Sequence, residues 1–216
     1  MSKPKLISFK LCPYVQRSVI LLKEKGVDYD IEYIDVYDPL EWFLALSPTG
    51  KVPILQVEDT VLFESAVINE YLDEVYTPAL HPSNPIKKAQ NRAWMEFTSP
   101  MYMDTFDIMM ATDKASSDSA VDSLNKNLAG FNSAMKMSPW FNGEAFSLVD
   151  ISAAPLFTRL AFYKEHCALD LLKAFPNLQA WSDDLLARQS VIESKVDGFD
   201  DMLLMRMGKI GTYINQ

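Results

Sequence analysis

Hydrophobic and polar positions over the first 75 residues alternate between strand spacing and helix spacing. Four short apolar runs have the length and composition of buried strands, at 6–9, 31–36, 53–57 and 61–63. Three segments carry apolar residues at helical spacing, from Pro13 to a stop at Gly26, weakly over 40–46, and over about 65–75. The pattern predicts a small α/β unit of order β-α-β-α-β-β-α.

Nearly every segment beyond the Pro-rich stretch 76–85 predicts a helix. The expected helices cover about 86–112, 120–137, 148–163 and 170–188, with a short piece near 190. The Ser/Asp-rich residues 113–119 are expected to separate the first two, and Ser147 with Asp150 matches the capping-box pattern that starts a helix. The sequence therefore predicts an α/β domain joined by an exposed linker to an all-helical domain.

Composition narrows the class of protein. Of 216 residues, 49% are hydrophobic and 23% charged, which is typical of a globular chain, and the net charge of −9 argues against nucleic acid as the main partner. Two cysteines and two histidines supply neither a disulfide framework nor a convincing Cys/His metal site. No apolar run approaches the ~18 residues of a membrane span, and the first residues lack a signal-peptide core. We therefore expect a cytoplasmic protein with no metal and no membrane partner.

The charge is unevenly distributed along the chain. Residues 1–25 hold six cations against one carboxylate, a net charge of +5, whereas residues 26–79 hold one cation against twelve carboxylates, a net charge of −11. A cationic first segment would help to hold a thiolate and attract an anionic ligand. The alternative is a solvated surface on which screening weakens such effects.

Cys12 is the strongest candidate for a reactive residue. It follows a strand and precedes Pro13, a favoured first residue of a helix, so it should occupy the N-cap position. Free amides and the positive end of the helix dipole favour the thiolate there, which is the reactive form in thiol–disulfide exchange. The alternative is a buried structural thiol. Because Val15 stands where a dithiol oxidoreductase has its second cysteine, any disulfide of Cys12 must form with an external thiol.

Two further segments could contact a ligand. Val52-Pro53 could form a cis-proline turn that leaves the backbone of Val52 free to pair with a peptide-like ligand, or Pro53 could simply mark a strand edge. Ser65 resembles an N-cap residue, and a helix N-terminus suits a carboxylate, while Glu64 could accept from an ammonium group. Capping alone would also explain Ser65.

These residues resemble a known family. Residues 11–17 (Leu-Cys-Pro-Tyr-Val-Gln-Arg), 51–55 and 64–72 are similar to the cytosolic glutathione transferases, and residues 141–150 resemble the start of the central helix of their C-terminal domain. The Cys-Pro-Tyr-x-x-Arg form is similar to the cysteine-type classes, omega and its plant relatives lambda and dehydroascorbate reductase. The resemblance implies a thioredoxin-like glutathione-binding domain over 2–79 and a helical domain over 85–210 that contributes the substrate cleft.

The resemblance also implies roles for individual residues. Cys12 would form a mixed disulfide with glutathione, the cosubstrate, and Val52 would pair with its cysteinyl backbone next to a cis Pro53. Glu64 and Ser65 would hold its γ-glutamyl end, while Lys51 matches a glutathione contact of some classes. Tyr14 could approach the sulfur or only pack. Pro39 stands where omega enzymes often have a basic residue, so the partner of the glycyl carboxylate is left open.

The leading hypothesis is an omega-like, glutathione-dependent thiol transferase that forms homodimers and acts on a small hydrophobic or disulfide second substrate, dehydroascorbate included. One alternative is a non-catalytic interaction protein of the stringent-starvation type, and another is a conjugating glutathione transferase. In the helical half, we expect Arg159 to form a structural ion pair, with a place at the border of the cleft as the alternative, and Cys167 to be inert. The segment 199–216 could pack over the cleft.

Overall fold

The computed structural model describes residues 3–135 and 139–215. Its first part is a four-stranded sheet of order β2-β1-β3-β4. The strands are β1 (Lys5–Ser8), β2 (Asp30–Tyr33), β3 (Ile54–Val57) and β4 (Thr60–Phe63). Strand β1 pairs in parallel with β2 and antiparallel with β3, and β3 pairs antiparallel with β4.

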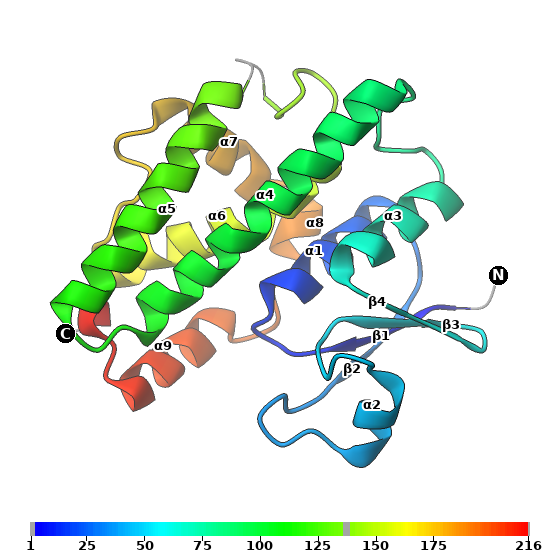
Figure 1. Cartoon of the computed structure of the whole chain (residues 1–216), viewed down its shortest axis with the longest axis horizontal. Coiled ribbons are helices and arrows are strands. Elements are labelled where there is room, and N and C mark those ends of the chain that lie inside the picture. The colour runs from blue at the N-terminus through cyan, green and yellow to red at the C-terminus, as the bar shows by residue number, and fades with distance from the viewer. Residues whose placement is uncertain (1–2, 136–138, 216) are drawn as a thin grey trace.

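Helices cover both faces of this sheet. Leu6 and Leu55 point towards α1 (Pro13–Glu24) and α3 (Ser65–Val75), whereas their neighbours Ile7 and Ile54 pack against Phe43 of the short α2 (Glu41–Leu46) on the other face. Adjacent strand residues face opposite sides, so two neighbouring apolar residues serve two layers. Figure 1 shows α2 on one side of the strands and α1 and α3 on the other. The predicted β-α-β-α-β-β-α order is confirmed.

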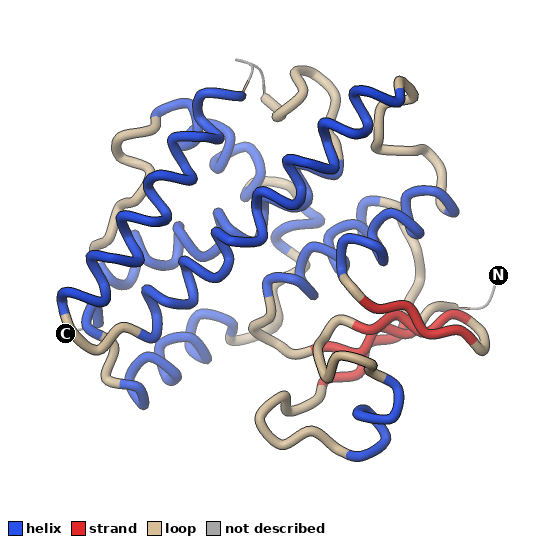
Figure 2. The backbone as a smooth tube through the Cα atoms, in the orientation of Figure 1, coloured by secondary structure: helices blue, strands red, loops and turns tan. Residues whose placement is uncertain are grey.

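The rest of the described chain is helical (Figure 2). Its helices are α4 (Pro85–Met110), α5 (Lys114–Ala134), α6 (Leu148–Cys167), α7 (Pro176–Leu186), α8 (Gln189–Ile192) and α9 (Phe199–Ile210), followed by the 3-10 turn η1 (Tyr213–Asn215). Helix α6 is buried almost throughout its length and packs against α1, α4 and α7. One apolar core runs from Leu6 through α6 to Met207, so the sheet and the helices share their packing.

Asp150 connects several segments beside α6. Its carboxylate accepts hydrogen bonds from the amide and hydroxyl of Ser147, at 2.8 and 2.7 Å, and so completes the predicted capping box. It also accepts from the amide of Phe141 and from Nε1 of Trp181 in α7, at 2.8 and 2.9 Å. The helix start is therefore also an anchor for its neighbours.

Several boundaries differ from those predicted. The expected break over 113–119 belongs to α5, because Asp113 caps that helix by accepting from the amide of Ser116 at 2.9 Å. Helix α7 begins at Pro176 rather than near 170, and α6 extends to Cys167. The expected end of the second long helix, 136–137, lies outside the described residues.

Candidate active site at the N-terminus of α1

Cys12 occupies the N-cap position of α1, as the sequence predicts. Its thiol is half-buried and free of any disulfide. Burial raises the pKa of Cys12, against the lowering effects of the Val15 and Tyr14 amides and of the positive charges of Arg159 and Arg17. Groups that favour the thiolate are therefore present, as the sequence predicts, but desolvation outweighs their effect on the pKa of Cys12.

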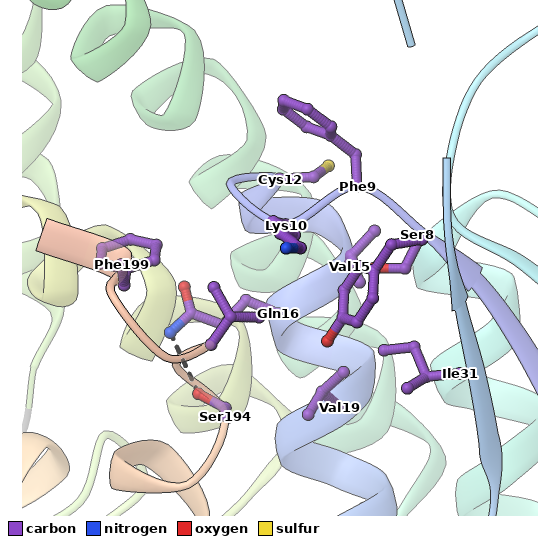
Figure 3. Close-up of a pocket in the computed structure, with 12 residues that line it drawn as sticks. Ser8, Phe9, Lys10, Cys12, Val15, Gln16, Val19, Ile31, Ser194 and Phe199 are labelled. Carbon is purple, nitrogen blue, oxygen red and sulfur yellow. Dashed lines mark hydrogen bonds between the residues drawn. The ribbon is translucent and has the colours of Figure 1, made fainter. Parts of the chain in front are cut away.

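The sulfur can be approached from one side. On that side, a cleft of about 470 Å³ lies between the sheet end of α1 and helices α4, α6 and α9. Behind Cys12, the space between α1 and the segment that follows α8 is a cavity of only about 10 Å³ (Figure 3). A small-molecule pocket has about 300–1,000 Å³. A ligand must therefore reach Cys12 through the larger cleft.

Arg159 fixes the segment that carries Cys12. Its buried guanidinium donates hydrogen bonds to the carbonyl of Leu11 and to Oε1 of Gln16, both at 2.8 Å, and to the carbonyl of Pro155 at 2.7 Å. Gln16 in turn donates to Oγ of Ser194 at 3.1 Å, an interaction drawn in Figure 3. The expected ion pair of Arg159 is wrong, because its acceptors are carbonyl and amide oxygens instead of a carboxylate.

Lys51, Val52 and Pro53 lie beside the cleft in the turn before β3. Lys51 and Val52 line it with Cys12, and the Val52–Pro53 peptide bond is cis, as the resemblance implies. The Lys51 amide donates to Oγ of Ser47 at 3.0 Å, and that hydroxyl donates to the Lys51 carbonyl at 3.1 Å. This reciprocal pair holds the turn in place while the Lys51 side chain is free of any ion pair with the described residues.

Glu64 and Ser65 form the start of α3, but in roles other than those predicted. Glu64, with a φ of 64°, takes the N-cap position, and Ser65 is the first helical residue, so the expected capping by Ser65 is wrong. Oγ of the buried Ser65 instead accepts hydrogen bonds from Nε and Nη2 of Arg17, at 2.9 and 2.5 Å. A non-glycine residue at positive φ is uncommon and often marks a functional site.

Arg17 ties the start of α3 to the helix of Cys12. Its guanidinium is buried, and Nη1 has no hydrogen-bond partner among the described atoms. Because Ser65 Oγ accepts two donors from Arg17, its own proton is left to donate to another acceptor. The start of α3 therefore presents a hydroxyl donor beside a positive charge, an arrangement that suits a carboxylate. Glu64 and Ser65 do not line the cleft itself.

Tyr14 lines the cleft with Cys12, and its hydroxyl is bonded to α4. The hydroxyl donates to the carbonyl of Ser99 in α4 at 3.2 Å, and the ring packs edge-on against Tyr102 with centroids 5.0 Å apart. Burial raises the pKa of Tyr14, against the effect of Arg17. Packing of Tyr14 is therefore observed, while its contact with glutathione stays a prediction.

The positive charge of residues 1–25 does not gather at the thiol. Four of its lysines form ion pairs with carboxylates of other segments: Lys3 with Asp28 and Asp30, Lys5 with Glu32, Lys23 with Glu193, and Lys25 with Asp73. The cations that lower the pKa of Cys12 are Arg17 and, from the helical half, Arg159. The interpretation of the charge run as a thiol-stabilising segment is therefore correct only for Arg17.

Helix α9 supplies cleft residues that the sequence did not place. Leu203 and Arg206 line the cleft opposite the sheet domain. Figure 1 shows α9 beside the C-terminal half of α4. The sequence indicated that 199–216 could pack over the cleft but predicted no helix there. Which surface this segment covers depends on contacts between distant segments.

Two family models match the chain along its length. The model described as "Glutathione S-transferase, N-terminal domain" matches residues 11–75, and the one described as "Glutathione S-transferase, C-terminal domain" matches residues 75–189. The chain belongs to the glutathione S-transferase family. The predicted thioredoxin-like sheet domain followed by the helical domain of this family is confirmed.

Individual relatives agree with this family and indicate the omega-like class. Glutathione S-transferase omega-1 of Rattus norvegicus is 29% identical over 199 residues, which cover 88% of this chain and 81% of that protein. A glutathione S-transferase of Hyoscyamus muticus is 31% identical over 195 residues, covering 82% and 91% of the two chains. The crystal structure of glutathione transferase Omega 3C from Trametes versicolor superposes with a TM-score of 0.80 at 28% identity, covering 91% and 90%. This glutathione transferase is thus an omega-like member of an enzyme family.

The described residues contain neither a cluster that could hold a metal ion nor a helix that could cross a membrane. No group of three or more His, Cys, Asp or Glu side chains there is arranged to hold a metal ion. Within the same part of the chain, none of the helices combines the length and apolar character needed to cross a membrane.

Proposed function

We propose that this glutathione transferase works as a glutathione-dependent thiol transferase through a mixed disulfide at Cys12. The observation that carries the proposal is the position of Cys12, a free thiol at the N-cap of α1 and on the wall of a cleft of about 470 Å³. The amides of Val15 and Tyr14 and the charges of Arg159 and Arg17 oppose the burial that raises the pKa of Cys12, and they would stabilise the thiolate that disulfide exchange requires. A conjugating mechanism would use a free Tyr14 hydroxyl to activate the thiol of glutathione, but this hydroxyl donates a hydrogen bond to the carbonyl of Ser99.

Glutathione would lie along the sheet side of the cleft. The backbone of Val52, beside the cis Pro53, would pair with the cysteinyl residue, and Lys51 and Tyr14 would border it. The start of α3 would hold the γ-glutamyl end, with the Ser65 hydroxyl donating to the carboxylate and Glu64 accepting from the ammonium group. The donors and acceptors of these residues therefore match the charges of glutathione.

The exchange balances over two steps. The Cys12 thiolate attacks the glutathione sulfur of a mixed disulfide, so that the bond from Cys12 to glutathione forms and the second thiol leaves as a thiolate. The thiolate of a second glutathione then attacks the same sulfur, releasing oxidised glutathione and restoring the Cys12 thiolate. Over both steps, the mixed disulfide and one glutathione thiol give oxidised glutathione and the free second thiol. The glutathionyl sulfur of the mixed disulfide stays at the disulfide level, the incoming glutathione sulfur is oxidised as the sulfur of the second thiol is reduced, and the proton of the incoming thiol passes through water to the released thiolate.

Relatives support this class of reaction. Glutathione S-transferase DHAR3 of Arabidopsis thaliana is 29% identical over 194 residues, which cover 88% of this chain and 70% of that protein. We extend the proposal to small disulfides and dehydroascorbate as second substrates, and to a cytoplasmic homodimer as the working form. In this proposal the chain divides as the sequence predicts, with the glutathione half over 2–79 and the cleft-forming half over 85–210.

Intact mass spectrometry tests the nucleophile. After incubation with oxidised glutathione, the wild type should gain the mass of one glutathionyl group and lose it on reduction. Cys12→Ala should gain none, whereas Cys167→Ala, which removes the other thiol, should keep the adduct. Turnover of a small glutathione mixed disulfide should likewise be lost in Cys12→Ala and kept in Cys167→Ala. Equal turnover by the wild type and Cys12→Ala would refute the proposal, and strong conjugation that survives in Cys12→Ala would favour a conjugating enzyme.

A further inference from the structure

The cleft beside Cys12 has an unusual charge for so acidic a protein. The chain has 29 acidic residues against 20 basic ones, yet among the described residues those that line the cleft include three cations and no carboxylate. The cations are Lys51, Arg159 and Arg206. Focused positive charge in a cleft attracts anions. The cleft is thus suited to a ligand that carries a negative charge, which a purely apolar second substrate would lack.

The three cations differ in the contacts that they already make with the rest of the protein. Arg159 uses its guanidinium on the carbonyls of Leu11 and Pro155 and on the side chain of Gln16. Lys51 stands next to Val52, at the end of the cleft that the proposed glutathione site occupies. Arg206 alone projects from α9, across the cleft from the sheet, and forms no ion pair with any described carboxylate. Arg206 is therefore the cation left for a second ligand.

Aromatic rings fix the guanidinium of Arg206. Its Cζ atom lies 4.8 Å from the ring centroid of Tyr37 and 5.9 Å from that of Phe106. Stacking on aromatic faces holds a guanidinium in one plane and leaves its edge available for in-plane hydrogen bonds. Nε of Arg206 is buried and has no hydrogen-bond partner among the described atoms. A buried donor without a partner is unfavourable, so an acceptor that reaches it stabilises the site.

The surroundings of Arg206 define the rest of the ligand. Phe9, Met103, Phe106 and Leu203 give the cleft an apolar wall between Cys12 and Arg206. Aromatic and thioether side chains favour a flat or flexible apolar body. We propose that the second substrate is an apolar or aromatic compound that carries a carboxylate, and that Arg206 binds this carboxylate. The inference rests on the proposed function for the glutathione half of the cleft and adds the class of the second substrate.

Two unreactive thioethers of glutathione test this assignment. One carries a para-carboxybenzyl group on the glutathione sulfur, and the other a para-carbamoylbenzyl group, a neutral analogue of nearly the same shape. Binding of both is measured by isothermal titration calorimetry, with unsubstituted S-benzylglutathione as a reference for the intact site. The wild type should bind the acid about tenfold more tightly than the amide, which corresponds to about 1.4 kcal/mol.

Variants assign that preference to Arg206. Arg206→Gln should bring the acid and the amide close to equal affinity while keeping the affinity for S-benzylglutathione, and Arg206→Lys should retain part of the preference. Lys209→Gln removes the same charge from an exposed position of the same helix and should keep the preference. The ratio of two ligands on one preparation does not depend on the fraction of folded protein. If Arg206→Gln is unstable, the ratio for Arg206→Lys provides the measurement.

Each contrary outcome has a separate meaning. An unchanged acid-to-amide ratio in Arg206→Gln overturns the inference. Equal weakening of all three thioethers also overturns it, since Arg206 would then bind a carboxylate of glutathione itself, and so does a lack of thioether binding by the wild type. The thioethers do not react with Cys12, so a failed mixed-disulfide assay with an intact ratio would count against the thiol chemistry alone.

Discussion

Arg159→Met removes the donor that connects α6 to the segment carrying Cys12. Methionine keeps much of the length and the apolar stem of arginine but donates no hydrogen bond. The substitution deletes the bonds at 2.8 Å to the carbonyl of Leu11 and to Oε1 of Gln16. It also removes a positive charge that lowers the pKa of Cys12. We expect both a less stable protein and a less reactive thiol.

The loss of stability follows from the acceptors that remain. Gln16 is buried, so its Oε1 is left without a donor, which costs about 1–3 kcal/mol. The Leu11 carbonyl is only partly buried, and water can replace the lost donor there. Removing the guanidinium also relieves the cost of a fully desolvated cation, since burial lowers the pKa of Arg159 itself. The free energy of unfolding should therefore fall by about 1–3 kcal/mol rather than by the sum of three bonds.

Urea unfolding and alkylation of Cys12 by iodoacetamide measure the two effects. Loss of the Arg159 charge raises the pKa of Cys12, so alkylation at neutral pH should be slower than in the wild type. Arg159→Lys should keep more of the alkylation rate than Arg159→Met, because lysine retains the positive charge although it lacks the planar guanidinium. A double-mutant cycle with Gln16→Leu should show coupling. If Arg159→Met leaves stability and alkylation unchanged, the positioning role of Arg159 is wrong.

Three further predictions concern buried or paired groups. Asp150→Ala should lower the free energy of unfolding by about 3 kcal/mol or more, because it leaves buried donors unpaired; a loss below about 1 kcal/mol in urea would contradict this. Burial raises the pKa of Cys12, so its alkylation rate should keep rising at pH values where a free cysteine thiol is fully ionised, and a plateau at neutral pH would show the opposite shift. Desolvation opposes ionisation of Glu70, but hydrogen bonds from Arg92 and His81 lower its pKa from 4.5. The stabilising contribution of Glu70 is thus present above pH 4.5 and lost as the pH falls through the folded-state pKa. Glu70→Gln should lower the free energy of unfolding by about 1 kcal/mol at pH 7 but by less under acid conditions, as urea titrations at both pH values would show.

The parts of the site that the sequence could predict are local. Cys12 precedes a proline that starts a helix, so its N-cap position follows from neighbouring residues. The capping box of Ser147 and Asp150 spans four residues and can be predicted from the sequence in the same way. The cis bond before Pro53 followed from the family resemblance, because a single sequence pattern does not distinguish the two isomers.

The errors came from contacts between distant segments. Arg159 looked like half of an ion pair, but its acceptors come from the Cys12 segment nearly 150 positions earlier. Ser65 matched an N-cap residue, but Arg17, 48 positions away, takes both acceptor sites of its hydroxyl. The lysines of the first segment looked available to a thiolate, yet their partners lie on β2 and other elements that only the folded chain brings near. No periodic pattern encodes such pairs.

For this glutathione transferase, the sequence alone determined most of the elements, the two-part architecture and the placement of one thiol at a helix start, because spacing, capping and turn residues act over a few positions. The tertiary structure decided the environment of that thiol. Burial raises the pKa of Cys12, α6 contributes the charge of Arg159 that opposes this effect, and α9 contributes Arg206 to the cleft. Desolvation and the geometry of charge depend on what surrounds a group in space, and the chain fixes those neighbours only when the sheet and the helices pack into one core.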